Sequence, residues 1–212
     1  MGRSSGMCRD TIVDLYERHA GDFDRDRSRN LQEKAWLDYF LARVRPAGVV
    51  LDMGCGIAEP IARYVLEAGF SVAGVDASPS MIAMCRARFP GSEWIVGDMR
   101  ELRLERRFDG ILAWDSFFHL HADDQRRMFP RFAVHVTPGA PLMFTSGPAH
   151  GEAIGSYRGE PLYHGSLDPA EYERLLCGSG FSILAHVAND PQCGQHTVWL
   201  AEYEPGSRTP AG

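Results

Sequence analysis

The sequence lacks any apolar run long enough to cross a membrane. Every such run falls far short of the roughly 18 residues that a membrane-spanning helix needs. No charged segment followed by an apolar one opens the chain, so we expect no secretion, no membrane partner and a cytoplasmic location. Internal repeats and low-complexity blocks are absent as well. With 44% hydrophobic and 24% charged residues among 212, the composition is that of a folded globular protein.

The cysteines and the charge balance exclude further classes. Five cysteines are an odd number, and no two of them form a Cys-x-x-Cys pair. This excludes a zinc ribbon and argues against a disulfide framework, so we expect reduced thiols. The net charge is -6. Because binding to nucleic acid depends on Lys and Arg that neutralise phosphates, this balance argues against a nucleic-acid partner.

Strand-like and helix-like segments alternate along the chain. Their alternation predicts a parallel sheet covered by helices on both faces. The last two strands have only a short link, which predicts that they pair antiparallel. The expected strands are 48–51, 70–75, 93–96, 108–114, 142–145, 181–187 and 197–203, and the expected helices are 30–44, 60–68, one from 79, one from about 123 and one from 169.

Local signals predict where several helices begin or stop. Asn30 and Glu33 have the spacing of a capping box. Ser78 and Asp168 each precede a proline, which predicts a helix start with Pro at its first position. Pro130 is expected to interrupt its helix, because proline cannot donate a backbone hydrogen bond.

The most specific local pattern is the glycine loop within VVLDMGCGIA. A buried strand runs into Gly54 and Gly56 and then toward a helix. Glycine lets the backbone approach a ligand closely, and a helix start offers free N–H groups. Dinucleotide folds need a small residue where Glu59 stands. The order acid-x-Gly-x-Gly-x-small, beginning at Asp52 and reaching Ala58, instead fits the folds that bind S-adenosylmethionine.

Two more acids stand at the ends of the next two strands. Asp76 ends the second strand, where an acid can accept both hydroxyls of a ribose. Asp98 ends the third strand, where it can accept a hydrogen bond from an adenine amino group, with Met99 against the ring. Each Asp alone is more commonly a turn or cap residue. Three acids at one sheet edge together favour a nucleoside-binding site.

With these motifs the chain resembles the class I S-adenosylmethionine-dependent methyltransferases of the small-molecule type. The resemblance covers about residues 10 to 203 and is carried by VVLDMGCGIAEP, GVDAS and GDM. It implies an α/β, Rossmann-like three-layer sandwich, whose mostly parallel seven-stranded sheet has an antiparallel last strand. We expect a single domain over 1–212, with a lid at about 8–29 and a disordered tail at 204–212. The implied cofactor is S-adenosyl-L-methionine, and the implied activity is methyl transfer to a small-molecule acceptor.

The resemblance also implies which residues bind the cofactor. The glycines would line its methionine part, Asp76 its ribose, and Asp98 with Met99 its adenine, while a lid arginine would pair with its carboxylate. The alternative for the lid is a solvated amphipathic helix, and for Trp114 a place in the core. The complete set is Asp52, Gly54, Cys55, Gly56, Asp76, Ala77, Asp98, Met99, Trp114, Tyr16, Phe23 and Arg27.

Candidate residues for the chemistry follow the fourth and fifth strands. His119 is the candidate general base, since histidine can remove a proton near neutral pH. Its alternative is a loop histidine bound to backbone. Residues 147–166 are expected to form a long loop, in which Tyr163 and His164 would make an acceptor wall or a solvated flap. His119 and His121 lack a third ligand at firm spacing, so we expect no metal.

Several alternatives stay open on sequence alone. An NAD-dependent oxidoreductase and a non-catalytic S-adenosylmethionine-binding protein would both use a similar glycine loop. The acceptor atom is O, N or C, and the oligomeric state is a monomer or a homodimer. The Asn-Pro-Pro-Tyr type of motif is absent, which argues against the amino group of a nucleic-acid base as acceptor.

Overall fold

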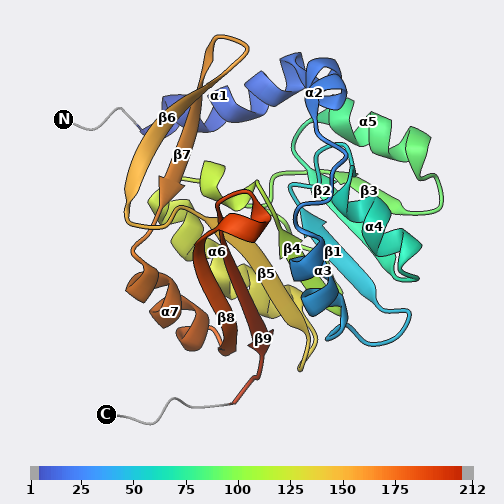
Figure 1. Ribbon diagram of the computed structural model, residues 1–212, viewed down its shortest axis with the longest axis vertical. Helices are drawn as coiled ribbons and strands as arrows, with labels where there is room; N and C mark the ends of the chain where they lie inside the picture. The colour runs from blue at the N-terminus through green and yellow to red at the C-terminus, as the bar shows by residue number, and fades with distance from the viewer. Residues whose placement is uncertain (1–4, 207–212) are drawn as a thin grey trace.

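The computed structural model describes residues 5–206 (Figure 1). They form three layers, in which a seven-stranded sheet lies between two layers of helices. The sheet order is β3-β2-β1-β4-β5-β9-β8. The first five strands pair in parallel, and β9 runs antiparallel between β5 and β8. The strands are β1 (Val49–Met53), β2 (Ser71–Asp76), β3 (Glu93–Val96), β4 (Gly110–Ala113), β5 (Pro141–Ser146), β8 (Phe181–Asp190) and β9 (His196–Tyr203). The predicted fold class is therefore confirmed. Of the predicted tail, 207–212 lie outside the described residues.

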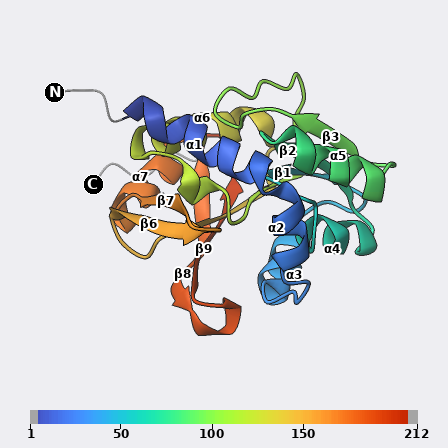
Figure 2. The same cartoon turned by 90° about the horizontal axis from the view of Figure 1, so that it is seen from above.

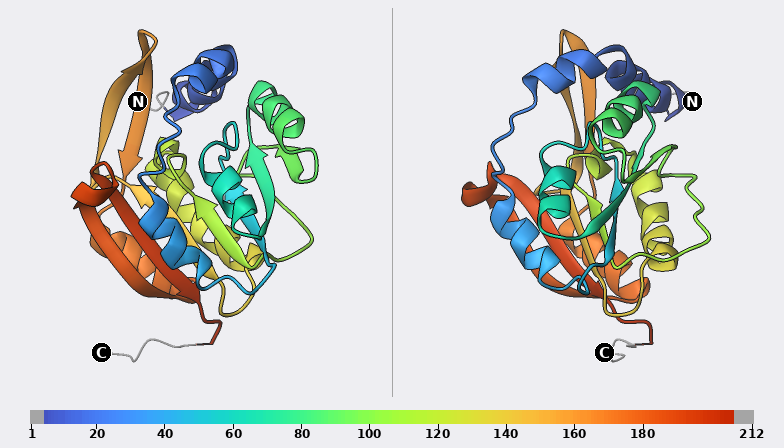
Figure 3. Two further views of the ribbon diagram at one scale, coloured as in Figure 1. Left: turned by 45° about the vertical axis from the view of Figure 1, so that its right-hand side comes forward. Right: turned by 90° about the vertical axis from the view of Figure 1, so that its right-hand side faces the viewer.

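Helices cover both faces of this sheet, because successive side chains of each buried strand point to opposite sides. Val50 and Leu112 pack with α3 (Lys34–Leu41), α4 (Ile61–Glu67) and α5 (Pro79–Arg88). Leu51 and Ile111 pack on the other face with α6 (Ala122–His135) and α7 (Pro169–Gly178). Figure 3 shows the sheet between these two layers. In the part of the chain described here, no helix is both long and apolar enough to span a bilayer.

Two helix signals were read correctly and two were wrong. The Ser78 hydroxyl accepts a hydrogen bond from the Met81 N–H, and Asp168 caps α7 in the same way. Asn30 does not cap α3, because that helix begins only at Lys34 and its N-cap Glu33 makes no side-chain capping bond. Pro130 does not interrupt α6 either. It lies on the exposed side of that helix, whose opposite side is held by buried aromatic packing.

The predicted loop 147–166 is instead a β-hairpin, which corrects that expectation. It consists of β6 (Gly151–Tyr157) and β7 (Glu160–Ser166). Arg158 and Gly159 form its two-residue turn, both with positive φ (53° and 82°), as such hairpin turns require. Most of β6 is exposed, so the apolar pattern that reveals a core strand is missing from it.

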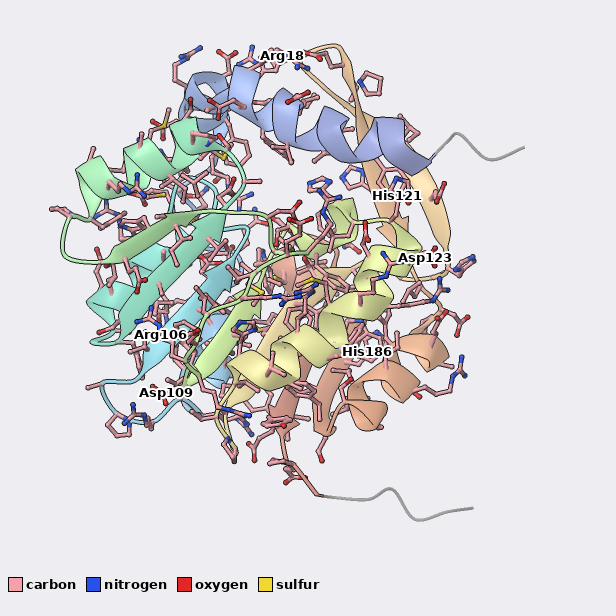
Figure 4. All side chains as sticks on the ribbon, turned by 180° about the vertical axis from the view of Figure 1, so that it is seen from behind. Arg18, Arg106, Asp109, His121, Asp123 and His186 are labelled. Atoms are coloured by element: carbon pink, nitrogen blue, oxygen red, sulfur yellow. The ribbon has the colours of Figure 1, made fainter. Side chains whose placement is uncertain are left out.

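The hairpin and the N-terminal helices together roof one edge of the sheet. The helices are α1 (Ser5–Arg18) and α2 (Ala20–Asp26), and α1 crosses above the strands (Figure 2). Arg18 lies beside the hairpin, where it pairs with Glu160 (Figure 4). Glu160 also binds His19 at 2.7 Å, and Arg158 pairs with Asp26. The segment predicted to be a lid thus forms a pair of helices tied to a second element about 140 residues away in the chain.

Candidate functional site

A cleft of about 390 Å³ lies between the roof and the carboxyl ends of the parallel strands. Ligands of open α/β sheets bind at this edge. The cleft brings together most of the residues that the sequence singled out. They are Tyr16, Phe23, Arg27, Gly54, Gly56, Asp76, Ala77, Asp98, Met99, His119 and His164.

The glycine loop is shaped by close contacts that leave no room for side chains. Gly54 has φ +80°, and a Cβ on it would lie 2.3 Å from the Cβ of Ser116. Its N–H donates to the Val75 carbonyl at 2.7 Å. The Gly56 N–H donates to one carboxylate oxygen of Asp76 at 2.9 Å. The loop therefore presents bare backbone to the cleft, which is the surface that a tightly held ligand needs.

Asp76 connects the glycine loop to the start of α5. Its second oxygen accepts the Ser78 N–H at 2.9 Å. Burial raises the pKa of this carboxyl, while backbone N–H groups from both sides oppose the shift. A carboxylate has about four acceptor positions, so Asp76 keeps spare capacity for an incoming hydroxyl. The position and the spare acceptors suit a diol.

The third strand end is held by an ion pair. Arg100 binds both oxygens of Asp98 with its side chain and donates its backbone N–H to one of them at 2.8 Å. The methyl end of Met99 lies next to Gly54, within 3.1 Å of where a Cβ would be. This edge therefore offers an apolar surface beside a charge-neutral pair.

Four of the predicted site residues do not line the cleft. Asp52 is buried at the end of β1, and burial together with the nearby Asp76 raises its pKa to about 7. Cys55 points into the core, where burial raises the pKa of its thiol. Trp114 packs in the core layer of α3 and α4. Tyr163 is buried with its hydroxyl bound to Glu152 at 2.9 Å.

The hydrogen bonds of His119 define its protonation. Its Nδ1 lies 2.8 Å from the Tyr163 carbonyl, which can only accept, so Nδ1 carries the proton. Its Nε2 is then free to accept the hydroxyl of Tyr16 at 3.0 Å. Burial lowers the pKa of His119 to about 4. His119 is therefore a neutral imidazole whose basic nitrogen faces the lid.

The sequence analysis missed a cluster centred on Asp115. This residue follows β4 with φ +50° and lines the cleft. It accepts hydrogen bonds from Arg27 of the lid at 3.2 Å and from His196 at 2.9 Å. Although burial opposes ionisation, these two partners hold the pKa of Asp115 below its usual value, and Asp115 raises the pKa of His196. Asp115 could have been predicted from the sequence, because it is a fourth acid close to the end of a strand. His196 could not have been predicted, because its place in the site depends on β9 starting at that edge of the sheet.

The lid is anchored on the far side of the cleft as well. Glu17 of α1 accepts hydrogen bonds from the hydroxyl and the N–H of Ser80 (2.6 and 3.0 Å) and from the Ser78 hydroxyl. These bonds lower the pKa of Glu17. Helix α1 thus lies directly over the Asp76 region.

Comparisons with known proteins agree with this geometry. Residues 50–139 match the family model described as a methyltransferase domain, which confirms the predicted resemblance. A dTDP-3-amino-3,6-dideoxy-alpha-D-glucopyranose N,N-dimethyltransferase of Streptomyces fradiae is 32% identical over 130 residues, which are 60% of this chain and 49% of the relative. A trans-aconitate 2-methyltransferase of Escherichia coli is 30% identical over 119 residues, 55% of this chain and 44% of the relative. The chain spans about half the length of the curated relatives it matches.

Solved structures share the fold over nearly the whole chain. The 1,6-didemethyltoxoflavin-N1-methyltransferase of Burkholderia thailandensis has a TM-score of 0.72 at 20% identity, covering 96% of this chain and 92% of its own. The magnesium protoporphyrin IX methyltransferase of Synechocystis also has a TM-score of 0.72, at 16% identity, covering 96% and 100%.

Proposed function

We propose that this chain, whose residues 50–139 belong to the methyltransferase domain family, transfers the methyl group of S-adenosylmethionine to a small-molecule acceptor. One observation carries the proposal. The ends of β1, β2 and β3 meet in a single cleft, where bare glycine backbone, a diol acceptor and an apolar edge follow one another. That sequence of surfaces suits an amino acid, a ribose and a purine in turn.

The fit can be assigned part by part. Gly54 and Gly56 would hold the methionine part, since a Cβ on Gly54 would fill the space against Ser116. Asp76 would bind the ribose, and Met99 would lie against the adenine beside Asp98. Arg27 is already paired with Asp115, so this pair would receive the carboxylate and the ammonium of the amino acid together.

In this proposal the protein aligns the cofactor with the acceptor and keeps water out of the cleft. When bound, S-adenosylmethionine supplies a methyl group made electrophilic by its sulfonium. The glycine loop and the lid fix the direction of approach, and alignment of this kind lowers a barrier by removing entropy cost beforehand. The roof of α1, α2 and the hairpin excludes water, and substrate exchange requires it to open.

Three finer features belong to the same proposal. We expect the protein to act in the cytoplasm, without a nucleic-acid partner, as a monomer or a homodimer. The net charge of -6 supports the second feature.

The test is calorimetric titration of the purified protein with S-adenosylmethionine, S-adenosylhomocysteine and NAD. Both sulfur ligands should bind the wild type. Asp76→Ala should abolish this binding, whereas Asp123→Ala, an exposed change outside the cleft (Figure 4), should leave it unchanged. If neither sulfur ligand binds, the proposal is wrong; binding of NAD alone would indicate an oxidoreductase.

A further inference from the structure

The charged side chains around the cleft leave nothing to match a charged acceptor. Apart from Asp76 on the cofactor side, each Asp or Arg among the described lining residues is ion-paired. Arg27 and His196 both bind Asp115, so neither is without a partner, and Arg100 pairs with Asp98. A carboxylate, phosphate or ammonium group entering this space would lose its hydration without gaining a counter-ion, which is costly. The charge pattern therefore favours an uncharged acceptor.

One part of the cleft lining is a wall of rings in contact with one another. The ring centroids of Phe118 and His164 lie 5.1 Å apart, and those of His119 and His164 lie 5.0 Å apart. Tyr16 completes the wall from the lid, 5.5 Å from His119. Burial lowers the pKa of His164 as well as that of His119, so the wall is uncharged. Rings of this kind bind other planar rings by stacking and edge contacts.

A chain of hydrogen bonds leads from the cleft to buried backbone. The Tyr16 hydroxyl donates to Nε2 of His119, so its oxygen is left to accept a proton from a bound molecule. On the far side, Nδ1–H of His119 donates to the Tyr163 carbonyl. That carbonyl would stabilise an imidazolium. This hydrogen-bond chain thus has a proton acceptor, the Tyr16 oxygen, at the cleft. At its buried end, the Tyr163 carbonyl accepts the hydrogen bond of a charged His119 ring.

We propose that the acceptor is an uncharged aromatic or heteroaromatic ring with an ionisable O–H or N–H, and that Tyr16 and His119 remove its proton in relay. The inference rests on the proposed methyl transfer. As the acceptor atom bonds to the methyl carbon, the carbon–sulfur bond breaks and its electron pair stays on sulfur. The acceptor proton passes to the oxygen of Tyr16, and the hydroxyl proton of Tyr16 passes to Nε2 of His119. The positive charge moves from sulfur to the imidazolium, so atoms and charge balance.

The two residues have matched properties for these roles. Burial raises the pKa of Tyr16 well above its usual value, so Tyr16 stays protonated and gives up its hydroxyl proton only as it receives another. The lowered pKa of His119 keeps it in the proton-free form across the physiological range, at the cost of basicity. Ring hydroxyls are far more acidic than aliphatic alcohols, which reduces the basicity that His119 must supply.

The acceptor class is tested with labelled S-adenosylmethionine and probes of similar size. 2-Naphthol, 7-hydroxycoumarin and benzimidazole should become methylated; 2-naphthoate, 2-naphthyl phosphate and 2-naphthylmethylamine should not. Faster methylation of a charged probe overturns the inference. So does a protein that binds S-adenosylmethionine but methylates none of the three uncharged probes. A protein that fails to bind S-adenosylmethionine refutes the proposed function itself, so the two failures are distinguishable.

The relay is tested with Tyr16→Phe and His119→Asn. Each should lower kcat for 2-naphthol by about 10²- to 10⁴-fold with little change in KM. The loss should be much smaller for 4-nitrophenol at about pH 6, where it is mainly uncharged but its far more acidic hydroxyl needs little help to lose its proton. A purely structural role would lower both rates equally and would overturn the relay. Tyr157→Phe is the matched control, because Tyr157 touches the Tyr16 ring at 6.4 Å but lies outside the cleft lining.

A second readout does not depend on turnover. Nitrogen NMR of the histidine rings should show His119 with a protonated Nδ1 and a proton-free Nε2 between about pH 6 and 8. Tyr16→Phe should shift the Nε2 resonance, because it removes the hydrogen bond there. A charged His119, or the opposite tautomer, would overturn the proposed direction of proton transfer.

Discussion

Replacing Gly54 by alanine tests how the glycine loop is shaped, and the structure sets the size of the effect. The φ of +80° belongs to the left-handed region, which costs a non-glycine residue about 1 to 2 kcal/mol. The new Cβ would lie 2.3 Å from the Cβ and 2.7 Å from the Oγ of Ser116. Ser116 must therefore move and strain its hydrogen bond to the Met53 carbonyl (2.7 Å). Crowding of this kind adds about 1 to 3 kcal/mol.

Urea unfolding followed by tryptophan fluorescence measures this cost, and Gly69→Ala is the matched control. Gly69 has φ +89°, but nothing lies within 4 Å of the Cβ it would acquire. Gly69→Ala should thus lose only the backbone contribution of about 1 to 2 kcal/mol. Gly54→Ala should lose about 2 to 5 kcal/mol in total. Calorimetry should show weakened binding of S-adenosylhomocysteine for Gly54→Ala alone.

The double variant Gly54→Ala/Ser116→Gly separates crowding from backbone strain. Removing the Ser116 side chain removes the clash, so the double variant should be more stable than the sum of the single effects predicts. Equal losses for Gly54→Ala and Gly69→Ala, or strictly additive effects in the double variant, would refute the assignment of the clash to Ser116.

Three further outcomes follow from contacts described above. Glu17→Ala should weaken S-adenosylhomocysteine binding by about tenfold, or about 1.4 kcal/mol, because α1 loses its bonds to the start of α5; unchanged calorimetric affinity would contradict this. Asp115 raises the pKa of His196, so that pair stabilises the fold fully below about pH 6.5 and loses its effect as pH rises through the raised value. The difference in unfolding free energy between wild type and His196→Gln should shrink accordingly between mildly acidic and mildly alkaline pH, and a difference that grows would contradict the sign. Pro130→Ala should raise stability by about 1 to 2 kcal/mol in thermal unfolding, because an exposed position in α6 regains a backbone donor; a lowered Tm would show that the proline has a packing role.

The sheet was predictable because its strands carry their own signals. Runs such as VVLDM are buried on both faces and read as strands without knowledge of any neighbour. The acids and glycines at their ends followed from the rule that parallel strands end at a common edge. Ser78 and Asp168 were predictable as caps, since capping depends on only three or four adjacent residues.

The missed features depend on contacts between distant parts of the chain. The hairpin has no buried face along β6, and it is held by the buried end of β7 and by the pairing of Glu160 and Arg158 with the N-terminal helices. Asp115 and His196 are 81 residues apart, and only the insertion of β9 beside β5 brings them together. Trp114 stands at a strand end like the site residues, but the alternation of side chains turns it into the core.

The place of β9 has a consequence for how the protein is completed during synthesis. β8 hydrogen-bonds to the sheet only through β9, the last strand of this sheet in chain order and so the last of them to leave the ribosome. Until then β5 is an open sheet edge and β8 has no partner strand in the sheet. The same strand delivers His196, so the carboxylate of Asp115 gains its second hydrogen-bond partner only at that moment. A chain that stops before residue 196 therefore carries both an unfinished sheet and an Asp115 held by Arg27 alone, so the cleft and the sheet are completed by the same strand.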